Sequence, residues 1–66
     1  MARFAQRSDI YRIDSMLQHG QPASYRGFVI TFDWANGYEG ESLDQTVYDF
    51  DSLSGLLRKI DNIVLH

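Results

Sequence analysis

The stretch Phe28-Val29-Ile30-Thr31-Phe32-Asp33-Trp34 decides the fold of this chain. Every second residue from Phe28 onward is aromatic or isoleucine, and the residues between them are Val, Thr and Asp. Successive side chains of a strand point to opposite faces, so this alternation predicts a strand with one apolar face, which we place over Tyr25–Trp34. One apolar strand face needs a covering layer.

An amphipathic helix is predicted before this strand, near Ser8–His19. Its apolar residues recur three and four positions apart, as Ile10, Ile13 and Leu17. Ser8 or Asp9 is the expected N-cap, because a short side-chain oxygen accepts from the free amides of the first turn. Gly20 stands where a left-handed helix terminator is needed.

A second amphipathic helix is predicted near Ser52–Asn62. Its stripe consists of Leu53, Leu56, Leu57 and Ile60. Asp51 or Ser52 is the expected N-cap. The two helices supply the apolar surface that can cover the strand.

A second strand is predicted near Gln45–Phe50, and two connections to the first compete. A tight turn at Asn36-Gly37 would set Phe32 opposite Glu41. A wide loop over Ala35–Asp44 would instead face Phe28 with Phe50 and Ile30 with Tyr48, and it is favoured because the buried face sets the register. Tyr38–Glu41 is left open as a short extra strand, and Phe28, Phe32 and Phe50 are expected in the core.

The predicted fold class is α+β, as one small domain over residues 1–66 in the order α-β-β-α. Both helices would pack on one face of an antiparallel hairpin, with a third short strand left open. Such a core is marginal, and the hairpin would leave open edges and an uncovered face. Because a second copy of the chain could cover these surfaces, a homodimer is an alternative.

Charge is segregated along the chain. The net charge is −3, but no Lys or Arg occurs between Gly27 and Leu57, where six carboxylates give −6. An acidic domain is poorly suited to bind nucleic acid or an anionic membrane directly. Because the chain has no cysteine, disulfides and thiolate metal sites are excluded.

No catalytic, metal or cofactor site is predicted, and the expected function is non-enzymatic. The serines form no nucleophile elbow, and the chain is small for a concave active site. Ala35 interrupts the ligand order of a calcium-binding loop. A protein that binds a metal through its loop carboxylates is therefore kept only as a third hypothesis. A signal peptide and long apolar runs are absent from the sequence, so a cytoplasmic location is expected by elimination.

The leading functional hypothesis is a module that binds a basic protein surface, including that of a nucleic-acid-binding protein, by imitating phosphates. Aromatic residues interleave with the acidic stretch, and Trp and Tyr are favoured in interfaces. The predicted partner-binding residues are Asp33, Trp34, Tyr38, Glu39, Glu41, Asp44 and Asp49. The alternative is a structural or regulatory homodimerisation module whose acids only confer solubility.

Three segments carry a resemblance in size, charge and layout. They are Tyr25-Arg26-Gly27-Phe28-Val29-Ile30, the acidic Tyr38-Glu39-Gly40-Glu41, and Phe50-Asp51-Ser52-Leu53 before the last helix. Over residues 25–63 the chain resembles small phage and mobile-element proteins, many of them acidic anti-CRISPR or anti-restriction inhibitors. The resemblance implies an inhibitor that blocks the nucleic-acid site of a host defence complex. It includes no diagnostic motif, and a net charge of −3 is modest for such a mimic.

Overall fold

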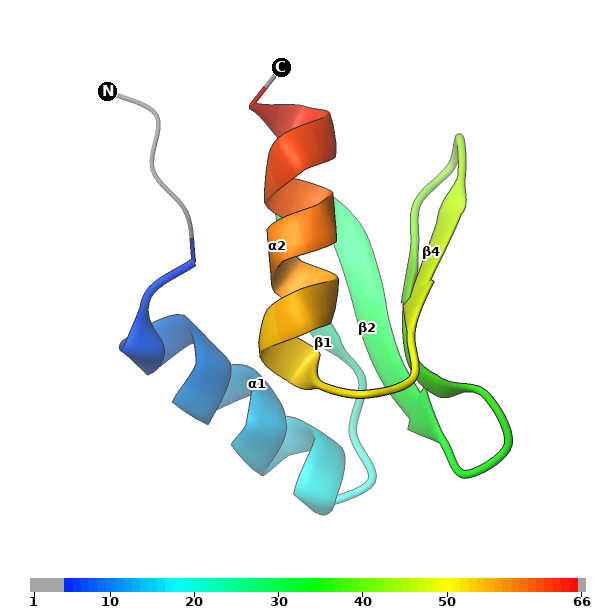
Figure 1. The fold of residues 1–66 in the computed structure, drawn as a ribbon. Helices are drawn as coiled ribbons and strands as arrows, with labels where there is room; N and C mark the ends of the chain where they lie inside the picture. Colours follow the sequence, from blue (N-terminus) through cyan, green and yellow to red (C-terminus); the bar gives the residue numbers. More distant parts are fainter. Residues whose placement is uncertain (1–4, 66) are drawn as a thin grey trace.

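A computed structural model describes residues 5–65, which form a four-stranded antiparallel sheet with two helices on one face (Figure 1). In chain order the elements are α1 (Arg7–Gln18), β1 (Ala23–Tyr25), β2 (Phe28–Asp33), β3 (Gly37–Glu41), β4 (Thr46–Asp49) and α2 (Leu53–Val64). The strands follow one another across the sheet in the order β1-β2-β3-β4. Helix α1 contacts β1 and β2, and α2 contacts β3 and β4. The expected α+β class is confirmed, but the sheet has four strands rather than two or three.

The strand predicted over Tyr25–Trp34 is present as β2, Phe28–Asp33, but its predicted start is wrong, because a tight turn separates Tyr25 into β1. Tyr25 pairs with Phe28, and only Arg26 and Gly27 lie between them. Both turn residues have positive φ, at 50° and 85°. A two-residue hairpin of this kind matches the twist of its strands. Glycine adopts that conformation freely, whereas arginine adopts it only with support from its surroundings.

The connection between β2 and β3 has neither predicted register. Asp33 pairs with Gly37 and Phe32 with Tyr38, so a three-residue loop replaces both the tight turn and the wide loop. The short strand left open over Tyr38–Glu41 is present as part of β3. In this register Gly40, rather than a charged residue, stands opposite Ile30 on the apolar face. The sequence favours a wide loop because a tight turn would place Glu41 opposite Phe32 on the apolar face. The observed register avoids that pairing without a wide loop.

Strand β4 turns the opposite face to the core from the one predicted. Val47 pairs with Gly40 and packs against the core, whereas Tyr48 is 50% exposed. Phe50, expected in the core, lies beyond the strand and is 68% exposed. Phe32 is also outside the core, at 40% exposure, because it lies beyond the part of β2 that is buried. Of the three phenylalanines expected inside, only Phe28 is buried.

Both helices begin and end near the predicted positions, where side-chain and backbone hydrogen bonds define the helix ends. Helix α1 is capped by Gln6 instead of Ser8 or Asp9, and the Asp9 carboxylate accepts from the Gln6 amide at 2.9 Å. Gly20 ends this helix with φ 73°, as predicted. Helix α2 begins after Ser52, whose hydroxyl accepts from the Gly55 amide at 2.9 Å, so Ser52 is confirmed as its cap.

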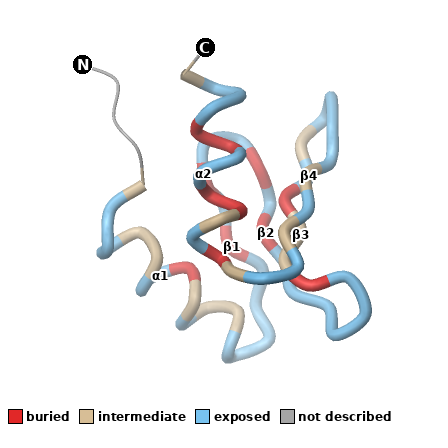
Figure 2. Tube along the Cα trace, viewed as in Figure 1, coloured by how far each residue is buried: buried red, intermediate tan, exposed pale blue. Residues whose placement is uncertain are grey.

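The core lies between the helices and the inner face of the sheet, which is the face toward the helices. Its buried hydrophobic members are Ile13, Ala23, Tyr25, Phe28, Ile30, Leu53, Leu56, Leu57 and Ile60. Figure 2 shows these buried segments facing one another across α2 and the sheet, while the β2–β3 connection is exposed. Fully burying an aliphatic or aromatic side chain stabilises a fold by about 1.5–3 kcal/mol, so this cluster is the main stabilising feature.

Candidate protein-binding surface

The seven predicted partner-binding residues do not form one continuous surface. Glu39 and Glu41 lie on the outer face of the sheet, which is the face away from the helices, whereas Tyr38 and Asp49 pair with each other on the inner face. The remaining three are connected to turns: Asp33 ends β2, Trp34 follows it, and Asp44 lies between β3 and β4. The structure therefore divides them among the outer face, the β2–β3 end and the β3–β4 turn.

The outer face of the sheet carries two carboxylates on β3, which is one of its two inner strands. Glu39 pairs with Thr31 on one side and Tyr48 on the other. Glu41, two residues further along β3, pairs in the same way with Val29 and Thr46. Residues two apart on a strand point the same way and are about 6.6 Å apart. None of the strand residues is basic, so this acidic face contains no compensating charge on the strands themselves.

The Asp49 carboxylate binds backbone amides just before α2 and is not part of an exposed surface. Its Oδ1 accepts from the amides of Asp51 and Ser52, each at 2.9 Å. Its Oδ2 lies 3.5 Å from Nζ of Lys59, and the side chain is only 15% exposed. The Ser52 amide, then the Asp51 amide and Lys59, hold the pKa of Asp49 below its ordinary value of 3.8. The carboxylate of Asp49 is therefore engaged within the protein and does not belong to the outer acidic face.

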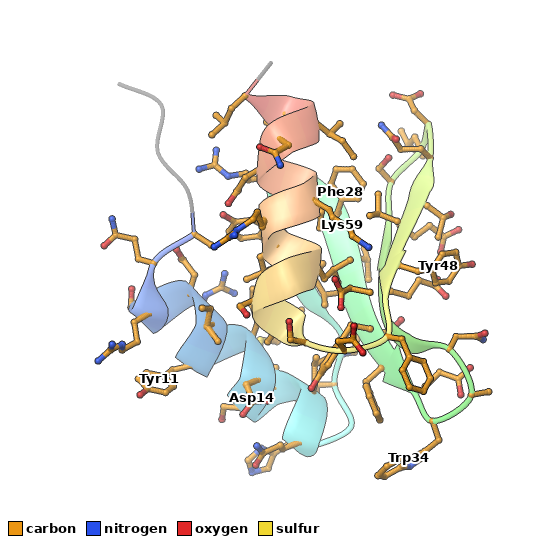
Figure 3. All side chains as sticks on the ribbon, viewed as in Figure 1. Tyr11, Asp14, Phe28, Trp34, Tyr48 and Lys59 are labelled. Atoms are coloured by element: carbon orange, nitrogen blue, oxygen red, sulfur yellow. The ribbon has the colours of Figure 1, made fainter. Side chains whose placement is uncertain are left out.

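An aromatic cluster occupies the β2–β3 end. The Phe32 ring lies 5.2 Å from the Trp34 ring at 80° and 4.9 Å from the Tyr38 ring at 55°. Trp34 is 89% exposed and points away from the body of the protein (Figure 3). The rings border a depression of about 460 Å³, here called the aromatic hollow, lined by Asp14, Leu17, Gln18, Phe32, Trp34 and Tyr38.

Sequence reasoning missed Phe32 and Asp14 as members of this surface. Phe32 continues the alternation of the buried Phe28 and Ile30, so the pattern alone places it inside. Asp14 belongs to α1, and no spacing along the chain connects it with β2. Only the packing of α1 beside β2 brings the two together.

Basic side chains lie over the edges of the sheet. From α1, Arg12 Nη2 donates to the carbonyl oxygen of Ser24 in β1 at 3.3 Å. From α2, Lys59 Nζ donates to the carbonyl oxygen of Tyr48 in β4 at 2.7 Å (Figure 3). Strands β1 and β4 are the two edges of the sheet. Basic residues at sheet edges hinder pairing with another strand.

The most buried polar group of the described chain is the carboxylate of Asp61. Its Oδ1 accepts from the Tyr25 hydroxyl at 2.6 Å and lies 2.9 Å from Nε of Arg26, and its Oδ2 accepts from the Ala5 amide at 2.7 Å. Burial, then the bond to Asp61, raises the pKa of Tyr25 above its ordinary 10.0. These bonds join α2 to the β1–β2 turn and to the start of the described chain, so the network is structural.

The described residues contain no group of three or more His, Asp or Glu side chains placed to hold a metal ion. Between residues 5 and 65, neither helix has the length and apolar character needed to cross a membrane. Comparison of the chain with protein-family models, curated proteins and solved structures finds no match.

Proposed function

We propose that this protein is a non-enzymatic binding module whose outer sheet face docks on a basic surface of another protein. The observation that carries the proposal is the position of Glu39 and Glu41 on an inner strand of the sheet, on the face away from the helices. Both carboxylates lie on the same face of β3, Glu39 in the middle of the strand and Glu41 at its end, and Val29 and Tyr48 beside them are about half exposed. A polar centre with exposed apolar neighbours can give both electrostatic steering and contact area.

The same arrangement disfavours homodimerisation through this face. A two-fold dimer contact pairs one patch with a copy of itself. A two-fold contact centred on β3 would bring Glu39 and Glu41 near the same two residues of the second chain, and like charges brought together cost free energy. Strand addition at the edges is hindered by Arg12 and Lys59. A partner of opposite charge is therefore the better match.

The partner class favoured by this proposal is a nucleic-acid-binding protein. Such proteins present clustered Lys and Arg to neutralise phosphates. Carboxylates repeated along a strand can engage the same cations, since steering depends on the field rather than on the chemical group. The resemblance to phage inhibitors supports a host defence complex as the first partner to test.

The test compares two variants that have the same net charge. Glu39→Lys with Glu41→Lys, and Asp44→Lys with Asp51→Lys, each change the net charge from −3 to +1. Immobilised wild-type protein and both variants are exposed to host lysate at low and high salt, and captured proteins are identified by mass spectrometry. We expect the Glu39/Glu41 variant to lose the partner about tenfold or more relative to the Asp44/Asp51 variant, because only it reverses the outer face.

Equal capture by the two variants would contradict the proposal, since net charge rather than the outer face would then determine binding. For a phosphate-mimicking mode, duplex DNA added in excess should displace the captured protein. Failure of DNA to compete would reject that mode while leaving binding to a basic surface intact. Circular dichroism of both variants establishes that they remain folded.

A further inference from the structure

We infer that the aromatic hollow binds an arginine side chain of the partner protein, an assignment that rests on the proposed function and adds a second contact to it. The hollow adjoins the C-terminal half of α1 and the β2–β3 connection. Its three rings come from Phe32, Trp34 and Tyr38, and Asp14 supplies the carboxylate.

The turn that carries Trp34 is held by side-chain hydrogen bonds of Asp33. Asp33 Oδ1 accepts from the Ala35 amide at 3.0 Å, and Oδ2 accepts from Nδ2 of Asn36 at 2.9 Å. These bonds fix the turn that carries Trp34. Phe32 packs against Trp34 edge to face, with an interplanar angle of 80°. A preorganised site lowers the entropy cost of ligand binding.

The chemistry of the lining selects a cation. The face of an aromatic ring is negative, and a cation above it gains electrostatic energy. Asp14 adds a full negative charge, and its Oδ2 is oriented by a 2.7 Å hydrogen bond from Nε2 of Gln18. The described lining contains no Lys, Arg or His that could occupy the hollow from within the chain. A planar guanidinium can stack on a ring and also hydrogen-bond a carboxylate, which makes arginine a better fit than lysine.

We assign the arginine to a basic protein segment, because acidic residues of the stretch without Lys or Arg adjoin the lining residues along the chain. Asp33 precedes Trp34, and Glu39 follows Tyr38 along β3. A basic segment lying along this end could place one side chain in the hollow while its neighbours reach the outer face. Charge complementarity therefore argues for a basic partner over a second copy of this acidic chain.

The test is a nuclear magnetic resonance titration of the whole protein with N-acetyl-arginine methylamide. The matched control is the citrulline analogue, which is planar and of similar size but uncharged. We expect saturable shifts of the Trp34 indole N–H, which is a single signal because the chain has one tryptophan, and of the Tyr38 and Asp14 amides. Citrulline should produce no saturable shift. Trp34→Ala should weaken arginine binding about fivefold, as expected for loss of a cation–π contact.

Equal shifts with arginine and citrulline would overturn the inference, since the hollow would then not select charge. Equal affinity for arginine and its lysine analogue would overturn the assignment of arginine. Shifts confined to Glu39 and Glu41 would also overturn it, but would leave the proposed function standing. Equal partner capture by the Glu39/Glu41 and Asp44/Asp51 variants, together with saturable arginine binding at Trp34, would reject the proposed function and leave the arginine site standing. Because Trp34 is 89% exposed, its replacement should leave the fold intact, which circular dichroism checks.

Discussion

Single residues of the same chemical type have different roles here because their surroundings differ. Asp61 is fully buried and its carboxylate accepts from three donors, including Nε of Arg26. Arg26 has a φ of 50°, a left-handed conformation that costs an L-residue about 1–2 kcal/mol. Its ion pair with Asp61 offsets this cost. Glu39, by contrast, lies on the outer face and has no such structural task.

Acid stability provides a test of Asp49. Its pKa is lowered in the folded protein, so on acidification the unfolded chain takes up a proton first, near the ordinary value of 3.8. Its contribution is therefore complete above that value and is lost as the pH falls through the folded pKa. We expect Asp49→Asn to reduce the free energy of unfolding at neutral pH by about 0.5–1 kcal/mol. Chemical denaturation across acidic pH should show this difference shrinking; a constant difference would contradict the assignment.

At the scale of elements, β3 is built around a glycine that lets α2 pack closely on the sheet. A Cβ at Gly40 would lie 2.9 Å from Cδ1 of Ile60 and 3.3 Å from Cδ1 of Ile30. Both isoleucines are completely buried, so neither can move into solvent. Glycine inside a strand commonly marks such a close approach.

Replacing Gly40 by alanine should therefore destabilise the protein through overpacking. We expect Gly40→Ala to lower the free energy of unfolding by about 1–3 kcal/mol. Ile60→Val removes the nearest methyl group and alone should cost about 0.5–1.5 kcal/mol. In the double variant the two costs should not add, because the valine makes room for the new Cβ. Additive costs in urea denaturation would show that the contact with Ile60 is not the cause.

At the scale of the whole molecule, the two sides of the sheet differ in charge. Arg12, Arg26 and Lys59 are engaged with the helix side, the β1–β2 turn or the sheet edges. The outer face presents Glu39 and Glu41. Because these cations lie on the helix side, in the turn or at the edges, they do not neutralise Glu39 and Glu41 on the outer face. This difference in charge between the two sides is the basis of the proposed binding.

The molecule should be a monomer in solution. Self-association through the outer face would oppose the two glutamates with their own copies, and both edges carry a basic side chain. Light scattering from micromolar to millimolar concentration should give a mass near 7.6 kDa. A mass that rises with concentration to twice that value would support the homodimerisation module instead.

Much of the local structure was predictable because it depends on neighbours in the chain. The period-two alternation from Phe28, the stripe of α2 and the Ser52 cap all follow from local geometry. The β1–β2 turn was missed because Arg26 is a rare residue at positive φ, and its support by Asp61 comes from the other end of the chain. The candidate site was predictable in part: Trp34 and the glutamates stand out by type, whereas Asp14 does not.

By itself, the sequence determined the helices, the strand tendency and the segregation of charge, since these depend on residue order and spacing. Only the tertiary structure decided the strand register, which face of β4 is buried and which carboxylates remain open. Register depends on how side chains such as Ile30, Ile60 and the Gly40 backbone fill a shared space. That space exists only when segments distant in the chain pack together, which local patterns do not encode.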